Sequence, residues 1–432
     1  MRVALLQRQN RLGAVRAPPS RYLKLRLLAV ELVYCGTLPT RLSRLGDAEA
    51  LLLGLKGFIT VNHYFPERWS EHAVRFFDTL FGRKHPPMIG LDISSSGVKL
   101  VELSQTDSGS FVLERFAIES FEKGWIADGQ IEKFDEVAEA VKRVVLRSGT
   151  KTRQVAMAMP ASQVITKKIM LPDGLREDEL ELQVETEANQ YIPFSLDEVS
   201  LDFCVVGTSQ NSAGDVEVLI AASRRDRVQD RQALAEAAGL KPVVLDIESH
   251  ASKLAIKRVV ETLPNKGRDA LVALFEIGAD TTSLKVLRDD EMVYERDQAF
   301  GGSQLTQLIS RQYGFSYEES EHKKLASELP DDYEATLLGP FVDSLSQEIG
   351  RALQYFFTST PHHKVHYVML AGGTATLPGL KDRVTELTGF ASMIVNPFEN
   401  MTLGTAVRES KLRREAPSYL TACGLAMRRF LQ

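Results

Sequence analysis

The sequence feature that most constrains the fold is a strand–turn–strand segment at residues 88–103. Its first strand is apolar on both faces, as in strands buried within a sheet, except for the acid Asp92. A turn of small residues, Ser94-Ser95-Ser96-Gly97, leads into a second apolar strand. Such a turn can direct backbone N–H groups and hydroxyls at an anion, and the neighbouring acid suits a hydrated magnesium ion. An ordinary hairpin whose acid caps its own turn is the competing interpretation.

A second copy of this pattern occurs 184 positions later. Residues 271–287 repeat the apolar strand, the acid, the small polar turn and the second strand, with Glu276 at the position of Asp92. Similarity at so long a separation indicates two related lobes rather than a short-period repeat. Two such hairpins that face one another would hold a polyphosphate between them.

A third segment, residues 368–380, places the paired glycines Gly372-Gly373 between an apolar strand and a helix start. Backbone without side chains lets a flat ring or a sugar approach closely. In this order the three segments resemble the phosphate-1, phosphate-2 and adenosine motifs of the actin-like ATPase superfamily, which includes actin, the DnaK-type chaperones, MreB and FtsA. The resemblance implies an α/β, actin-like (ribonuclease H-like) fold of two lobes, with a small α+β insert in lobe one.

The same resemblance implies a site for ATP and Mg²⁺. Asp92 and Glu276 would be metal ligands and catalytic acids. Asp246 and Glu248, in the first turn of the helix that joins the lobes, would position the attacking water. The nucleotide-binding residues would be Ser94, Ser95, Ser96, Lys99, Gly278, Thr281, Thr282, Gly301, Gly302, Glu321, Lys324, Gly372, Gly373 and Thr374.

Two of these expectations have specific alternatives or consequences. Glu321 and Lys324 lie three residues apart on one helix face, where a plain helical ion pair is the competing interpretation. Glu276 stands where the motif normally carries Asp, and a displacement of about 1 Å can cost about a hundredfold in rate. Phosphates are held mainly by backbone amides and metal, so we expect ATP binding to survive and hydrolysis to be weak or absent.

A narrower resemblance lies in residues 182–199, in Leu201-Asp202-Phe203, in Gly301-Gly302 and in residues 329–333. These segments resemble PilM, the actin-like family of type IV pilus assembly, and the similarity runs from about Arg75 to the C-terminus. The family implies a cytoplasmic protein, peripheral to the inner membrane. Its partners would be the N-terminal tail of a PilN-like membrane protein, PilO- and PilP-like proteins and motor ATPases, with no nucleic acid.

The loop after the acidic helix of the insert is the predicted wall of the partner groove. Tyr191, Ile192 and Phe194 place apolar groups where Pro193 prevents the helix from continuing. In the PilM family the groove between the insert and lobe one receives the PilN peptide. The competing interpretation, held equal, is that Ile192 and Phe194 anchor the insert to lobe one.

The predicted domain organisation follows from these motifs. The segments are an atypical Arg-rich leader (1–74), lobe one first part (75–163), the insert (164–223), lobe one second part with the connecting helix (224–260), lobe two (261–390) and a C-terminal segment that returns to lobe one (391–432).

The leader differs from the rest of the chain in charge. Residues 1–86 hold 14 Lys and Arg against six Asp and Glu, whereas the remainder holds 38 and 51. A targeting or nucleic-acid-binding arm is one interpretation; a start that is not native, with the true protein beginning near Val74, is the preferred one.

No apolar run approaches the ~20 residues of a spanning helix. The three cysteines, few and widely spaced, are typical of a reducing compartment.

Two further functions remain open at this point. One is an FtsA-like filament or cell-division protein, although residues 422–428 do not resemble an FtsA-type membrane helix. The other is an actin-like ATPase that actively hydrolyses its nucleotide. A type II secretion assembly uses a related actin-like component, usually fused to a membrane span.

Overall fold

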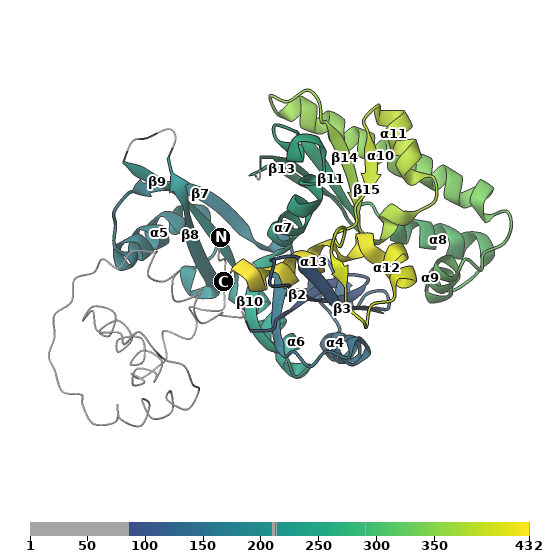
Figure 1. Cartoon of the computed structure of the whole chain (residues 1–432), viewed down its shortest axis with the longest axis horizontal. Coiled ribbons are helices and arrows are strands. Elements are labelled where there is room, and N and C mark those ends of the chain that lie inside the picture. Colours follow the sequence, from purple (N-terminus) through teal and green to yellow (C-terminus); the bar gives the residue numbers. More distant parts are fainter. Residues whose placement is uncertain (1–85, 210–211, 213, 290, 432) are drawn as a thin grey trace, which may run out of the picture. The chain divides into compact units, whose positions relative to one another are not determined.

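The computed structural model describes residues 86–209, 212, 214–289 and 291–431. The predicted leader, and with it the proposed start near Val74, lies outside the described residues. Figure 1 shows two sheets with their helices and a smaller insert sheet, all formed by residues after 85. Among the helices so described, none is both long and apolar enough to cross a membrane.

The first sheet belongs to lobe one and has the strand order β10-β6-β1-β2-β3-β16. β1, β2 and β3 pair antiparallel, whereas β6 and β10 continue the sheet in parallel. The bounds of its strands are β1 (Ile89–Ser94), β2 (Gly97–Gln105), β3 (Phe111–Ser120), β6 (Gln154–Met159), β10 (Lys241–Ile247) and β16 (Thr402–Leu403).

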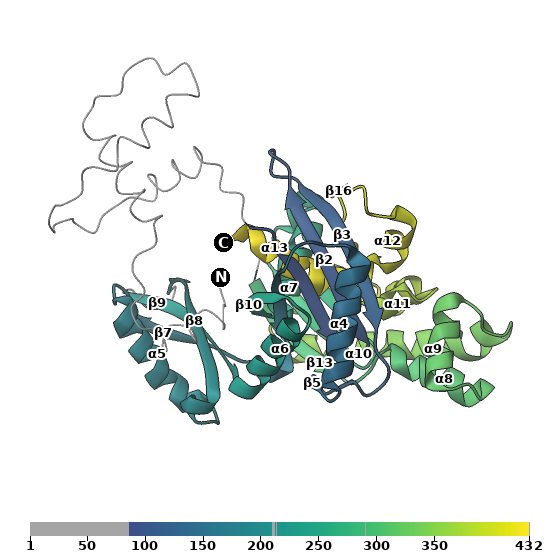
Figure 2. The same cartoon turned by 90° about the horizontal axis from the view of Figure 1, so that it is seen from below.

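Helices α4 (Phe134–Ser148) and α6 (Arg225–Ala237) cover one face of this sheet (Figure 2). The sequence predicts the apolar stripe of α4, and its members Val137, Val141 and Val144 are fully buried against strand residues. Between β3 and α4 lies a short hairpin of β4 (Ile126–Ala127) and β5 (Gln130–Ile131).

The insert has a sheet of its own, ordered β7-β9-β8, with one helix. Its elements are β7 (Ile165–Pro172), α5 (Glu177–Tyr191), β8 (Val199–Thr208) and β9 (Asp215–Arg224), in the order that the sequence predicts. Val184 and Ala188 of α5 pack on Val218 and Ile220 of β9, so this unit has a separate apolar core.

The second sheet belongs to lobe two and is ordered β13-β12-β11-β14-β15. Its strands are β11 (Val272–Ile277), β12 (Thr282–Arg288), β13 (Glu291–Gln298), β14 (Tyr367–Ala371) and β15 (Ser392–Ile394); its helices are α8 (Gly302–Tyr313), α9 (Tyr317–Ala326), α10 (Gly339–Ser359) and α11 (Leu380–Thr388). β11 and β12 form an antiparallel hairpin, as β1 and β2 do. β15 lies beyond residue 390, so the second sheet extends past the predicted boundary of lobe two.

Two helices join the lobes: α7 (Glu248–Val260) and α13 (Leu420–Met427), which lie side by side in Figure 1. α13 follows α12 (Glu409–Glu415) and is buried along its whole length. A Cβ on Gly424 would lie 1.8 Å from the Ala251 carbonyl oxygen, and one on Gly90 would lie 2.2 Å from that of Ala422. Glycine therefore lets α13 fit between β1 and α7.

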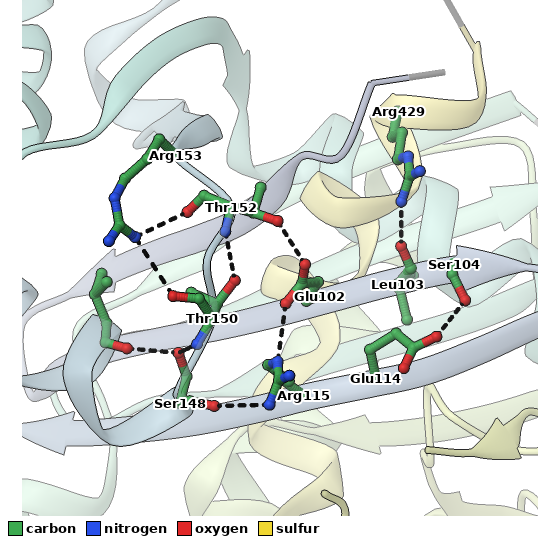
Figure 3. A network of polar contacts seen from close by, with 11 residues as sticks. Glu102, Leu103, Ser104, Glu114, Arg115, Ser148, Thr150, Thr152, Arg153 and Arg429 are labelled. Carbon is green, nitrogen blue, oxygen red and sulfur yellow. Dashed lines mark hydrogen bonds and ion pairs between the residues drawn. The ribbon is translucent and has the colours of Figure 1, made fainter. Parts of the chain in front are cut away.

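A polar network fixes the outer end of the first sheet (Figure 3). Glu102 on β2 accepts a hydrogen bond of 2.6 Å from the Thr152 hydroxyl and pairs with Arg115 on β3. Arg429, two residues after α13, donates a 2.8 Å bond to the Leu103 carbonyl. The segment after α13 is thereby attached to lobe one.

Candidate functional site

The first predicted acid is neutralised within its own hairpin. Asp92 lies opposite Lys99 in the β1–β2 pairing, and Lys99 Nζ is 3.1 Å from Asp92 Oδ2. The same ammonium donates to the Ser94 hydroxyl at 3.2 Å, and that hydroxyl donates to the Gly97 carbonyl at 3.1 Å. Asp92 is only 7% exposed, so the lysine offsets the cost of burying its charge.

The two-residue turn between β1 and β2 consists of Ser95 and Ser96. Ser96 is exposed at the turn, and its carbonyl accepts a 2.9 Å hydrogen bond from Phe121 N. The turn therefore has the short, small-residue form that the sequence predicts, and it is anchored on the loop after β3.

The second acid is held from two sides. Glu276 Oε2 accepts a hydrogen bond from Lys285 on β12, and Oε1 accepts one of 3.2 Å from the Thr421 hydroxyl on α13. Burial lowers the pKa of Lys285, but the charge and hydrogen bond of Glu276 outweigh it and leave that pKa above the ordinary value. Lys285 therefore stays charged although it is 4% exposed.

Charged groups of both hairpins act on Glu248, the first residue of α7. Burial, followed by the nearby charge of Asp92, raises the pKa of Glu248 to about 7; Glu276 acts in the same direction, and Arg231 and Lys285 oppose it. Asp92, Glu248 and Glu276 thus form one electrostatic group contributed by both lobes and the helix that joins them.

Asp246 is placed differently from the prediction. It belongs to β10, which continues in parallel register with β6 through Ile247, so α7 begins two residues later. Its carboxylate accepts a 2.8 Å hydrogen bond from Ile247 N and pairs with Arg428, with no exposed surface. Asp246 therefore holds the segment after α13 on lobe one instead of lying in the first turn of the connecting helix.

The second turn and the start of α8 use their amides internally. Gly278 N donates to the Thr281 carbonyl at 2.9 Å, and Gly302 N donates to the Gly278 carbonyl at 3.0 Å. Thr282 is buried and donates from its hydroxyl to the Phe300 carbonyl at 2.6 Å, whereas Thr281 is exposed. A phosphate would have to exchange with these bonds to reach the amides.

The predicted adenosine segment packs directly on this second turn. The Thr374 hydroxyl donates to the Gly278 carbonyl at 2.8 Å, and a Cβ on Gly302 would lie 2.5 Å from Thr374 Oγ1. Gly372 has a φ of +90°, which favours glycine, and Gly373 beside it is exposed. A Cβ on Gly301 would lie 2.3 Å from the Ala279 carbonyl oxygen, so this glycine is needed for loop packing.

Glu321 and Lys324 form the expected pair, and Thr306 on α8 completes it. Glu321 Oε2 accepts from Lys324 at 2.6 Å and from the Thr306 hydroxyl at 2.5 Å, and Lys324 also donates to Thr306 at 2.7 Å. Thr306 was not predicted from the sequence. Its position four residues after Gly302, on the first turns of α8, is the signal that could have found it.

The predicted metal ligands do not form a ready Mg²⁺ site. Mg²⁺ needs oxygen ligands, yet Asp92 and Glu276 each hold a lysine ammonium. Over the described residues, no three His, Cys, Asp or Glu side chains are grouped to hold a metal. A cavity of 780 Å³ lies elsewhere, between α10 and α11, and none of the predicted site residues lines it.

A family model described as "Type IV pilus assembly protein PilM" matches residues 90–430. The chain belongs to this family. The match covers both lobes and the insert and begins after the Arg-rich leader. The sequence-based identification as a PilM-type protein is therefore confirmed.

One solved structure agrees with this assignment, and two others are less similar. A structure described as a PilM–PilN type IV pilus biogenesis complex matches 80% of this chain and 99% of its own, with 28% identity and a TM-score of 0.66. EutJ, an ethanolamine utilization protein of Carboxydothermus hydrogenoformans, matches 79% of this chain and 89% of its own, with 15% identity and a TM-score of 0.48. MreB5 of Spiroplasma citri, bound to AMPPNP, matches 79% of this chain and 95% of its own, with 12% identity and a TM-score of 0.40. The PilM-family chain has the mixed α/β actin-like ATPase fold that its motifs imply.

The three residues predicted to contact a partner have unequal surroundings. Ile192 is buried in the core of the insert, so it neither lines a surface nor anchors the insert to lobe one. Tyr191 and Phe194 are 45% and 40% exposed. Lys167 lies 4.8 Å from the Tyr191 ring centre, and Arg224 lies 5.8 Å from that of Phe194.

Proposed function

We propose that this chain is an ATP-binding scaffold of type IV pilus assembly, which holds the N-terminal tail of a PilN-like inner-membrane protein in a nucleotide-sensitive groove. Family membership supports the pilus role, and the similar PilM–PilN complex supports the partner. The observation that carries nucleotide binding is the acidic hairpin repeated in both lobes, with Lys99 paired to Asp92 in one and Lys285 paired to Glu276 in the other.

A triphosphate would bind between the hairpins by competing for their cations. Lys99, which pairs with Asp92 beside the small turn, is the group placed to exchange a carboxylate for a phosphate oxygen. Ser94, Ser95 and Ser96 offer hydroxyls and backbone amides at the same turn. Glu321, Lys324 and Thr306 offer donors and an acceptor for the nucleoside.

Slow hydrolysis follows from the surroundings of the acids. Glu276 has both oxygens engaged, by Lys285 and Thr421, so it is not a free carboxylate. Burial and the charge of Asp92 raise the pKa of Glu248 to about 7, in the range that suits a general base. In this proposal ATP acts mainly by changing the contacts between lobes.

Tyr191 and Phe194 are the proposed contacts for the PilN-like tail. Both are exposed aromatic groups on the insert, each beside a cation. Aromatic side chains of this kind supply contact area for an extended peptide, and the cations suit carboxylates on it. PilO- and PilP-like proteins and motor ATPases would join through the bound membrane protein, at the inner face of the inner membrane.

A calorimetric titration of the full chain with ATP tests the proposal. It is run with Mg²⁺ and with EDTA, in the presence and absence of a synthetic PilN-like N-terminal peptide. We expect saturable ATP binding that Lys99→Met weakens, and a peptide affinity that changes when ATP is present. Absence of ATP binding by the unmodified chain would contradict the nucleotide role.

The partner role has its own variants. Phe194→Glu should abolish peptide binding, whereas Leu182→Glu, an exposed position on α5, should leave it unchanged. Equal binding by both variants would contradict the proposed surface.

Phosphate release that Asp92→Asn abolishes would favour an active ATPase, and nucleotide-dependent sedimentation would favour an FtsA-like filament.

A further inference from the structure

A contact joins the two lobes beside the predicted nucleotide residues. Lys123, in the loop between β3 and β4 of lobe one, places its Nζ 4.9 Å from the ring centre of Tyr317, the first residue of α9 in lobe two. This cation–π distance lies within the ~6 Å range of attraction. Lys123 is exposed and Tyr317 is half-buried.

The base of the Lys123 loop is fixed on the first phosphate turn. Phe121 N donates a 2.9 Å hydrogen bond to the Ser96 carbonyl, and the Phe121 and Trp125 rings lie 5.4 Å apart. The tip is open: Gly124 has a φ of +86°, and no atom lies within 4 Å of where its Cβ would be. The loop therefore presents one cation at an open tip over a fixed base.

Tyr317 begins the helix that carries the residues predicted to contact the nucleoside. Glu321, which accepts hydrogen bonds from Thr306 and Lys324, lies four residues further along the same helix, α9. Burial, with the charges of Glu321 and Asp280, raises the pKa of Tyr317 to about 12, so the phenol stays neutral. These acids also make the surroundings of the ring favourable for an ammonium.

We propose that Lys123 and Tyr317 form a clasp between the lobes, which must open for a nucleoside triphosphate to leave. The clasp connects the loop fixed at Ser96 with α9, the helix that carries Glu321 and Lys324, so in this proposal a ligand held by both groups would be enclosed by the connection. This inference rests on the proposed nucleotide site and assigns a control of residence time to two residues outside it.

Stopped-flow displacement of a fluorescent ATP analogue from the full chain measures the clasp. A partly exposed cation–π contact corresponds to a roughly two- to fivefold change in rate. We expect Lys123→Met and Tyr317→Leu each to speed dissociation by about this factor, and the double variant to be no faster than either. Tyr317→Phe keeps the ring and should stay near the unmodified rate.

Lys133→Met, at another exposed lysine of lobe one, is the matched control and should leave dissociation unchanged. Unchanged rates for both Lys123→Met and Tyr317→Leu, or additive effects in the double variant, would overturn the clasp. If the unmodified chain binds no nucleotide, the proposed function fails. The Lys123–Tyr317 contact is then tested by measuring amide hydrogen exchange. Faster exchange of residues 121–125 in both single variants then supports the clasp, and unchanged exchange overturns it.

Discussion

Thr421 on α13 donates a 3.2 Å hydrogen bond to Glu276 on β11, across 145 residues of sequence. Because a threonine has one O–H, the Ser252 hydroxyl, 3.0 Å from Thr421 Oγ1, must donate to it. A directed chain therefore runs from Ser252 through Thr421 to Glu276, which Lys285 approaches from the other side. It links both connecting helices to the second sheet and gives Glu276 a structural role.

Replacement of Thr421 by valine should destabilise the fold. The isosteric change leaves Glu276 Oε1 and the Ser252 hydroxyl without this partner in a largely buried site, at a cost of about 1–3 kcal/mol. Urea unfolding measures the loss. Thr385→Val, on α11, is the control and should stay within about 0.5 kcal/mol; equal losses in both would contradict the linking role.

Shortening Glu276 to aspartate should raise phosphate release. The change restores the acid that the motif normally carries and shortens the reach toward Thr421, so the carboxylate is freed from the chain of hydrogen bonds. We expect an increase of about tenfold or more over the unmodified chain, within the range that a displacement of about 1 Å can account for. A phosphate-release assay at saturating ATP decides it, and an unchanged rate would show that Glu276 does not limit hydrolysis.

Stability should fall as the pH rises from about 5 to about 7. The pKa of Glu248 is raised from 4.5 to about 7 in the folded protein, so the folded state binds more protons in this interval. The contribution is present in full below the unfolded pKa and is lost by about pH 7, on the order of 2 kcal/mol. Unfolding midpoints at several pH values measure the slope.

Glu248→Gln should flatten that slope, leaving a smaller dependence. A slope that is identical in Glu248→Gln and in the unmodified chain would contradict the assignment to Glu248.

Gly424→Ala should disrupt the packing of α13. The added Cβ would lie 1.8 Å from the backbone oxygen of Ala251, and a backbone atom cannot move aside as a flexible side chain can. We expect a loss of about 1–3 kcal/mol or more, as in other overpacked cores. Gly207→Ala, where no atom lies within 4 Å, is the control, and thermal unfolding of both variants is the measurement.

The sequence predicts those parts of the fold that repeat or have a period. Both acidic hairpins are predicted by the same local pattern of apolar strand, acid, small polar turn and second strand. Helix α4 is predicted by its apolar stripe at residues such as Val137 and Val141. The sequence places the start of α7 too early, at Asp246, because the strand continues through Ile247. That extension depends on pairing with β6, which has no local signal.

The sequence does not predict which side chains form hydrogen bonds and ion pairs with the acids of the hairpins. The contact of Lys285 with Glu276 depends on the β11–β12 register, and that of Thr421 depends on where α13 packs beside α7. The contact of Lys123 with Tyr317 joins residues of different lobes and likewise has no sequence signal. Such pairs arise from tertiary packing, which local patterns do not encode.

The position of α13 between β1 and α7 has a consequence for how the protein is made. Of the strands that the structure describes, β1 is synthesised first, yet the space beside Gly90 is filled only when residues 420–427 have emerged. Lobe one therefore cannot complete its interior during synthesis, and its nascent form exposes apolar surface that chaperones bind. Translation that stops before residue 420 leaves a chain with an unfilled slot where this helix belongs.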